Sequence, residues 1–288
     1  KGDTNLIPME HIMLKASAQV KSALILSALN LHGTTKIIET RNTRDHTERL
    51  MSYLNIKFKK KALTKNSTLI ELNGPYEIKP RNIIVASDPS SAAFFIVGAL
   101  IIPNSNITLK NIALNKTRIA FIDILKKMGG IIKVKKTSSV SGESVGDIKI
   151  SHSILKGIKI KASLSPYLID EYPILSIAAT QAKGVTIMEG LSELRHKESD
   201  RIKSITTNLS KLGFSINNKK DNISIKGSKN IKINNQVRIK TYGDHRIAMA
   251  FSILSLLYEN KLVLDDEACI SVSYPNFKRH LNELSILY

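Results

Sequence analysis

Four short, nearly all-apolar segments, each opened by Ser or Asp, constrain the fold of this chain more than any other feature. Ser and Asp cap helices because their side-chain oxygens accept hydrogen bonds from the first free backbone N–H groups. A helix that is apolar on every side belongs in the interior of a domain. The sequence therefore predicts four buried helices, over Ser17 to Asn30, Ser90 to Ile102, Asp170 to Ala182, and Asp244 to Leu257.

A strand and a second helix follow each of these segments. The predicted strands are rich in β-branched residues, and the second helices are amphipathic. Gly129, Gly213 and Asn55 are placed to end three of the second helices. A repeat of about 70–80 residues results, made of helix, strand, helix and strands. The strands are expected at Thr34–Ile38, Ile107–Leu109, Val185–Ile187 and Leu262–Leu264, and the second helices near Thr43, Thr117, Lys197 and Pro275.

This order of elements indicates an α/β class in which sheets surround buried helices. A doubly wound parallel sheet also alternates helix and strand. It does not explain the all-apolar first helices, and no Gly-x-Gly-x-x-Gly motif follows any of the predicted strands. We therefore prefer the repeat.

The composition limits the classes of partner. The chain has 43 Lys and Arg against 24 Asp and Glu, a net charge of +19, so anions are attracted to it. Aromatic residues make up only 5% and Trp is absent, whereas nucleic-acid binders often stack bases on aromatic side chains. The longest apolar run, Ala92 to Ile102, is too short for a membrane span of about 18 residues. We expect a soluble, cytoplasmic monomer that binds no nucleic acid or membrane.

Charged side chains gather at the predicted helix starts, where free N–H groups and the helix dipole favour anions. The apolar stripe of the third amphipathic helix, extended back by one turn, lands on Glu198. That carboxylate is either an ordinary first-turn Glu or a partly desolvated group suited to donating a proton. Lys197 and Arg201 are four residues apart and would share a helix face, from which both could reach one anion.

Other candidate groups have simpler explanations. Asp170 and Asp244 read as helix caps, but Arg246 at a buried helix start suggests an anionic partner. Cys269, the single Cys, lies in a strand-like stretch and is expected to be a core residue. The seven His have no metal-ligand spacing, so neither a metal nor a cofactor is expected.

Six motifs resemble the 5-enolpyruvylshikimate-3-phosphate synthase family, in that family's order and spacing. The resemblance implies two domains built from βαβαββ units, with helix N-termini directed at a cleft. Residues 1–86 would then be the later part of a first, incomplete domain, and residues 87–288 most of the second. The motifs are Ala16–Leu24, Thr43–Glu48, Asp88–Phe94, Ile169–Pro173, Leu194–Arg201 and Gly243–Met249.

The resemblance also implies an activity, the transfer of the enolpyruvyl group of phosphoenolpyruvate to the 5-hydroxyl of shikimate-3-phosphate. Asp170 would accept the proton of that hydroxyl, and Glu198 would protonate the methylene carbon of phosphoenolpyruvate. Arg201 and Arg246 would clamp phosphoenolpyruvate, and their planar forks suit carboxylate and phosphate. The implied contacts to shikimate-3-phosphate come from Ser17, Ala18, Gln19, Arg44, Asp170 and Lys197.

The sequence departs from the family pattern in places. Val272 stands where some members carry a Lys, and His196 replaces a frequent Val. The family's N-terminal Lys-Ser pair and Gly-Asn-Ala-Gly-Thr loop have no counterpart, so we expect an N-terminally truncated chain that is inactive alone. The alternatives are UDP-N-acetylglucosamine enolpyruvyl transferase, which uses a mobile-loop Cys, a nucleic-acid-end-processing protein on the same repeat, and an inactive remnant.

Overall fold

The structure, a computed structural model, describes residues 7–259 and 261–285. The chain divides into two compact units. The first contains Lys1–Ala86 and Ser138–Val145, and the second contains Ser87–Thr137 and Gly146–Tyr288. Residues 1–6, which the sequence prediction placed in the first domain, lie outside the described residues. No helix among the described residues is long and apolar enough to span a membrane.

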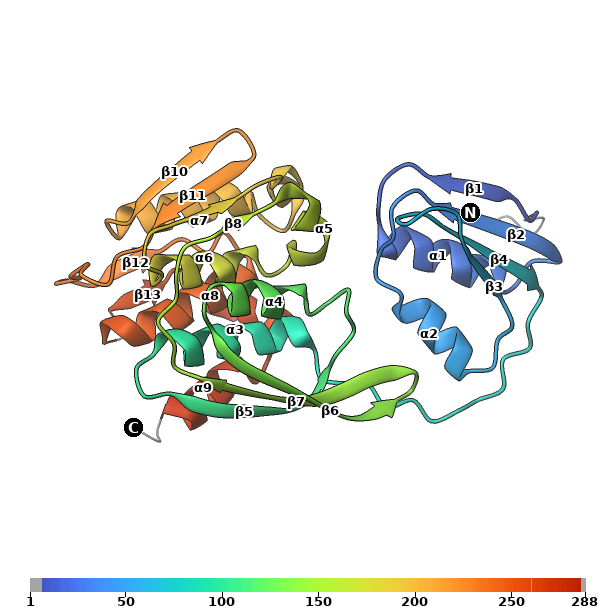
Figure 1. Ribbon diagram of the computed structural model, residues 1–288, viewed down its shortest axis with the longest axis horizontal. Helices are drawn as coiled ribbons and strands as arrows, with labels where there is room; N and C mark the ends of the chain where they lie inside the picture. The colour runs from blue at the N-terminus through green and yellow to red at the C-terminus, as the bar shows by residue number, and fades with distance from the viewer. Residues whose placement is uncertain (1–6, 260, 286–288) are drawn as a thin grey trace. The chain divides into compact units, whose positions relative to one another are not determined.

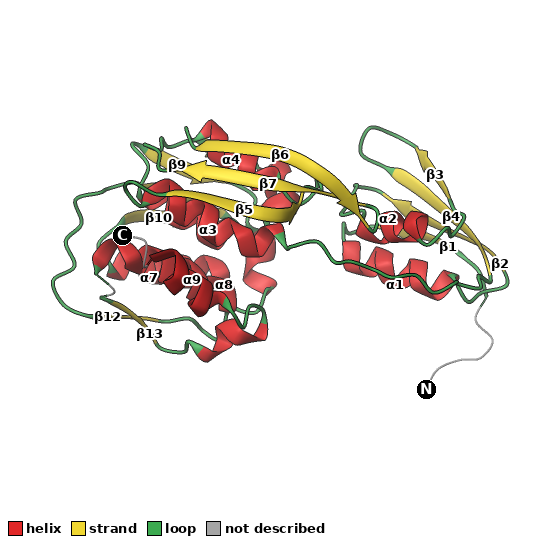
Figure 2. Cartoon of the chain, turned by 90° about the horizontal axis from the view of Figure 1, so that it is seen from below, coloured by secondary structure: helices red, strands yellow, loops and turns green. Residues whose placement is uncertain are grey.

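The first unit is one mixed sheet with two helices on the same face (Figure 2). The strand order is β1-β2-β4-β3, with β1 and β2 parallel and the other pairs antiparallel. Ile25 of the first helix packs against Ile37 and Ile70 of the sheet to form the core. The elements are β1 (Glu10–Met13), α1 (Ala18–Ala28), β2 (Gly33–Glu39), α2 (His46–Tyr53), β3 (Lys59–Ala62) and β4 (Thr68–Gly74).

The second unit has a larger core, in which helices α3, α6 and α8 pack together with sheets around them (Figure 1). Its first half contains α3 (Pro89–Ile101), β5 (Asn106–Ala113), α4 (Ala120–Lys127), β6 (Ile131–Val140), β7 (Glu143–Ser151), β8 (Lys159–Ile160), η1 (Ala162–Leu164), α5 (Ser165–Leu168) and α6 (Tyr172–Thr180). Its second half contains β9 (Val185–Met188), η2 (Ser192–His196), α7 (Arg201–Lys211), β10 (Ser215–Lys219), β11 (Asn222–Lys226), β12 (Val237–Ile239), α8 (His245–Ser255), η3 (Leu256–Tyr258), β13 (Leu262–Leu264), η4 (Ala268–Val272) and α9 (Phe277–Ser285).

The predicted repeat is confirmed by the strand order. The sheet β8-β9-β11-β10 has the same order and the same parallel first pair as β1-β2-β4-β3. A third copy has the order β5-β7-β6, and Ser87 forms a parallel bridge to Ile112 of β5 where the first strand of the other copies would lie. In each copy a long helix lies between the first two strands and a second helix precedes the hairpin, which is the pattern βαβαββ; the copy that starts at β8 also has the short η1 and α5 before α6.

The prediction of four fully buried helices is right for three. Every residue of α6 is buried, as are 12 of the 13 residues of α3 and 8 of the 11 residues of α8. Helix α1 is different, because only Lys21, Ile25 and Ala28 are buried while Val20 and Leu26 are about half exposed. The single sheet of the first unit covers one face of α1, and this leaves its other apolar face open in that unit.

The predicted second helices and their stops are also confirmed, although each helix starts a few residues late. Gly129 and Gly213 follow α4 and α7 with φ of 98° and 88°, and Asn55 follows α2 with φ of 60°. These left-handed conformations end a helix, and Gly adopts them without steric cost. Two predicted caps are wrong: Asp88, and not Ser90, caps α3, and Asp170 caps no helix because α6 begins at Tyr172.

Candidate active site

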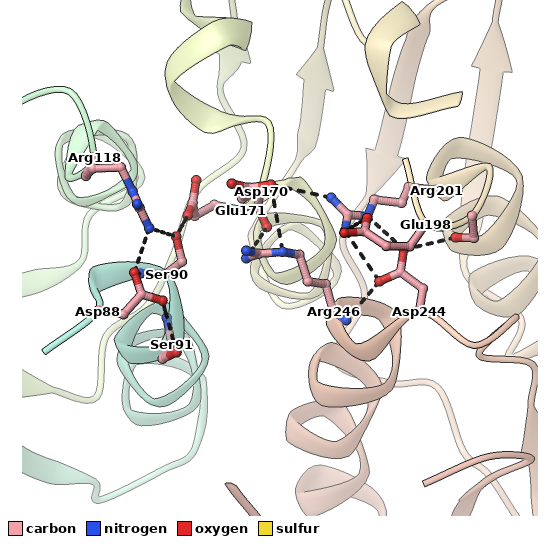
Figure 3. A network of polar contacts seen from close by, with 11 residues as sticks. Asp88, Ser90, Ser91, Arg118, Asp170, Glu171, Glu198, Arg201, Asp244 and Arg246 are labelled. Atoms are coloured by element: carbon pink, nitrogen blue, oxygen red, sulfur yellow. Dashed lines mark hydrogen bonds and ion pairs between the residues drawn. The ribbon is translucent and has the colours of Figure 1, made fainter. Parts of the chain in front are cut away.

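Three loops of the second unit bring carboxylates and guanidinium groups together at the starts of α6, α7 and α8 (Figure 3). Arg201 is the first residue of α7 and its side chain is 0% exposed. Around it lie three carboxylates, each from a different loop. Asp244 accepts from its Nε at 2.8 Å, Glu198 accepts from its Nη2 at 2.6 Å, and Asp170 Oδ1 lies 3.6 Å from its Nη1.

Asp244 organises the two arginines of this cluster. Its carboxylate caps α8 by accepting from the backbone N–H of Arg246 at 2.9 Å, and it also accepts from Ser199 Oγ at 3.1 Å. Burial raises the pKa of Asp244, but the hydrogen bond and the charge of Arg201 outweigh this effect and hold the pKa below its ordinary value. The sequence interpretation as a cap is confirmed, but it missed the ion pair with Arg201. No local signal in the sequence indicated this pair, because the two residues are 43 positions apart.

Arg246 lies beside Asp170 at two points. Its Nη1 donates to the backbone carbonyl of Asp170 at 3.2 Å, and its Nε lies 3.8 Å from Asp170 Oδ1. Asp170 is thus flanked by Arg201 and Arg246. Arg201 Nη1 is buried and has no hydrogen-bond partner, so one donor of its fork is unused and faces the Asp170 side of the cluster.

The prediction that Glu198 and Lys197 stand on a helix is wrong. Helix α7 starts at Arg201, because Asp200 caps it by accepting from the backbone N–H of Lys203 at 3.0 Å. Lys197 is extended and exposed, and it shares no helix face with Arg201. The Glu198 side chain is 50% exposed, so of the two alternatives for this carboxylate the partly desolvated one is not observed. Glu198 nevertheless meets the cluster through its bond to Arg201.

The other predicted binding residues lie in the first unit. Ser17 caps α1 by accepting from Val20 N–H at 3.3 Å, Ala18 begins that helix, and Gln19 is exposed on its first turn. Arg44 is half-buried, just before α2.

A buried ion network, which the sequence interpretation missed, connects the two segments of the first unit that carry these residues. Lys21 of α1 contacts Glu39 at 3.1 Å and Glu48 of α2 at 2.9 Å. Glu39 in turn accepts from the backbone N–H and the hydroxyl of Thr43, which precedes Arg44. A Lys within an apolar helix was the signal for such a network, because burying its charge requires a counter-ion.

Cys269 is a buried core residue, as expected, but its surroundings are helical and not strand-like. It lies in η4, and its thiol donates to the carbonyl of Asp266. Burial and the charge of Asp266 raise the pKa of this thiol, which lowers its thiolate population. It therefore lacks the setting of a reactive cysteine. Among the described residues, no three His, Cys, Asp or Glu side chains are grouped so that they could hold a metal ion.

Comparisons with known proteins give a consistent relationship. Residues 5–281 match the family described as EPSP synthase (3-phosphoshikimate 1-carboxyvinyltransferase). The chain is 40% identical to the 3-phosphoshikimate 1-carboxyvinyltransferase of Sphingopyxis alaskensis and 42% identical to that of Petrotoga mobilis, in each case over 96% of this chain. It spans 62% of the length of these two curated relatives.

Solved structures agree on the fold. The EPSP synthase of Acinetobacter baumannii superposes with a TM-score of 0.85 at 36% identity, covering 97% of this chain and 63% of that one. The enolpyruvyl transferase NikO of Streptomyces tendae has a TM-score of 0.73 at 15% identity, covering 98% of this chain and 65% of that one, a likeness of fold alone. The predicted fold class is thereby confirmed.

Proposed function

Because the chain belongs to the EPSP synthase (3-phosphoshikimate 1-carboxyvinyltransferase) family, we propose that it serves the transfer of the enolpyruvyl group from phosphoenolpyruvate to the 5-hydroxyl of shikimate-3-phosphate. Phosphate is released in this step of chorismate and aromatic amino acid biosynthesis. The observation that carries the proposal is the placement of Asp170 between Arg201 and Arg246, with Glu198 bound to Arg201. Two cations for an anionic substrate thus lie beside two carboxylates of different exposure.

In the proposed mechanism, Asp170 accepts the proton of the 5-hydroxyl while that oxygen bonds to C2 of phosphoenolpyruvate. Glu198, which solvent can reach and reprotonate, gives a proton to C3, and a tetrahedral intermediate results. The C2–O bond to phosphate then breaks, C3 returns a proton to the Glu198 carboxylate, and the enol ether and phosphate are the products. Arg201 and Arg246 bind the carboxylate and phosphate groups through charge-assisted hydrogen bonds.

We further infer that the first unit contributes to shikimate-3-phosphate binding through Ser17, Ala18, Gln19 and Arg44, and the second unit through Lys197. Residues 1–86 would belong to the later part of one family domain and residues 87–288 to most of the other. A cytoplasmic location and a monomeric state remain expectations. No observation favours UDP-N-acetylglucosamine as the acceptor, since buried Cys269 does not suit an enzyme that uses a mobile-loop Cys.

The test measures phosphate release and enol ether formation from the two substrates by the protein that carries this chain. We expect Asp170→Asn and Glu198→Gln each to lower kcat by on the order of 10²–10⁴-fold with smaller effects on affinity. Glu283→Gln, on the exposed side of α9, is the matched control and should leave turnover unchanged. Turnover with UDP-N-acetylglucosamine in place of shikimate-3-phosphate would refute the proposal, as would near-parental kcat in both carboxylate variants.

A further inference from the structure

One buried carboxylate next to this cluster has no part in the mechanism above. Glu171, which directly follows Asp170, is fully buried, and it accepts a hydrogen bond from Ser90 Oγ of α3. The same Ser90 oxygen accepts from Arg118 Nη2 at 2.8 Å, and Arg118 also binds Asp88 at 2.6 Å (Figure 3). Glu171 is therefore held in place by α3 and by the loop before α4, on the far side of Asp170 from Arg201.

The charges that face Glu171 come from three different segments. Arg118 approaches from the loop before α4 and Arg246 from α8, while Asp170 adds a negative charge from the neighbouring residue. When Glu171 and its neighbours Asp88 and Arg118 are counted with the cluster, five carboxylates stand against three guanidinium groups. The carboxylates are Asp88, Asp170, Glu171, Glu198 and Asp244, and the guanidinium groups are Arg118, Arg201 and Arg246. With every group ionised, the cluster is net negative, which opposes the binding of an anionic substrate.

Protonation of Glu171 would reduce this excess. Burial and the charge of Asp170 raise its pKa, the hydrogen bond from Ser90 and the charges of Arg246 and Arg118 lower it, and together these effects raise the pKa to about 7. Asp244, in contrast, is held ionised by its pair with Arg201. Near neutral pH, Glu171 can therefore change from charged to neutral when a charge near it changes.

We propose that Glu171 is a positioning residue of the anion site that takes up a proton from solvent when phosphoenolpyruvate binds at Arg246. The bound anion pairs with Arg246, so Arg246 stabilises the charged form of Glu171 less. The anion also adds negative charge near Glu171, and both effects favour the neutral carboxyl. Once it is protonated, Glu171 no longer competes with the substrate for the charges of Arg246 and Arg118. Substrate binding and protonation of Glu171 therefore favour each other. This inference rests on the proposed function, because phosphoenolpyruvate is the anion concerned.

The test is calorimetric titration of phosphoenolpyruvate, with shikimate-3-phosphate present, into the protein that carries this chain. Titrations at pH 7 in buffers with different ionisation heats give the number of protons taken up. A group half protonated before binding and fully protonated after it takes up about half a proton. We expect the parent to exceed Glu171→Gln by about that amount, because the titration of the ligand's own phosphate contributes equally to both and cancels. Glu283→Gln should behave as the parent.

A second variant tests the inference independently, in case Glu171→Gln does not fold. Ser90→Ala removes a hydrogen bond that favours the charged carboxylate, so the pH of maximal proton uptake should rise. Equal uptake by the parent and Glu171→Gln, or an unmoved maximum in Ser90→Ala, would overturn the inference and leave the proposed function standing. Failure of the parent to bind phosphoenolpyruvate would instead overturn both.

Discussion

Asp244→Ala is the substitution whose cost the structure specifies most fully. The Asp244 side chain is 0% exposed, as is that of Arg201, with which it pairs at 2.8 Å. The substitution removes the partner of the Arg201 Nε and the cap of α8. Arg201 remains buried, and its nearest remaining carboxylates are Glu198 and the more distant Asp170.

Two general magnitudes bracket the loss of stability. Breaking a buried ion pair costs about 3–5 kcal/mol, because one charge is left without compensation. Losing a helix cap costs about 0.5–2 kcal/mol. One carboxylate makes both interactions and Glu198 still compensates Arg201 in part, so the two costs do not add fully. We expect the free energy of unfolding of the second unit to fall by about 3–5 kcal/mol.

Hydrogen exchange of the amides in α7 and α8 measures this loss, since it reports on the second unit alone. Asp244→Asn keeps an oxygen that can accept from Arg246 N–H, so it should recover about 1 kcal/mol relative to Asp244→Ala. The pKa of Asp244 is lowered in the folded state from 3.8, so its charge stabilises the fold above that pH. This stability is lost as the pH falls through the lower, folded value. A loss below 1 kcal/mol at pH 7 would refute the role assigned to Asp244.

Three further expectations concern other groups. Lys21→Met should lower the free energy of unfolding of the first unit by about 3–5 kcal/mol, because it leaves buried carboxylates without a counter-ion. Adding Glu48→Gln should recover part of the lost stability, as urea unfolding followed by hydrogen exchange of the α1 amides would show. The pKa of Glu171 is raised from 4.5 to about 7 in the folded state, so its contribution to stability is fully present below pH 4.5. This contribution declines by about 3 kcal/mol as the pH rises to 7, and unfolding of Glu171→Gln measured against pH should lack the decline. Arg246→Lys keeps the charge but loses the fork, and should weaken phosphoenolpyruvate binding by about 10- to 100-fold in a direct titration; unchanged affinity would remove Arg246 from the site.

The repeat could be predicted because its signals are local. Apolar helices, β-branched strands and the stops at Gly129 and Gly213 depend on residues close together in the sequence. The exposed side of α1 could not be foreseen, since it depends on how many sheets surround the helix. The helix start at Arg201 was in principle visible, because Asp200 is a favoured cap, but the apolar stripe led the interpretation one turn too far.

The site itself was predicted from a resemblance more than from the residues. The sequence suggests an anionic partner for Arg246, but the contact of Arg201 with Asp244 spans 43 positions and depends on the packing of α7 against α8. Glu171 escaped notice for a similar reason. Its partner Ser90 is 81 positions away, and nothing near it in the sequence distinguishes a buried carboxylate from an ordinary helix-start Glu.

The repeated strand order separates the tasks of stability and chemistry within each copy. In the second unit, the segment just before each buried helix carries an acidic residue: Asp88 before α3, Asp170 before α6, and Asp244 before α8, where the parallel pair β12-β13 corresponds to the first two strands of the repeat. Asp88 binds Arg118, and Asp170 lies between two arginines. Asp244 pairs with Arg201 and caps α8. A duplicated scaffold of this kind can diversify one loop while the apolar helices behind it stay unchanged. Equivalent positions in the repeat have in this way come to hold three different electrostatic environments.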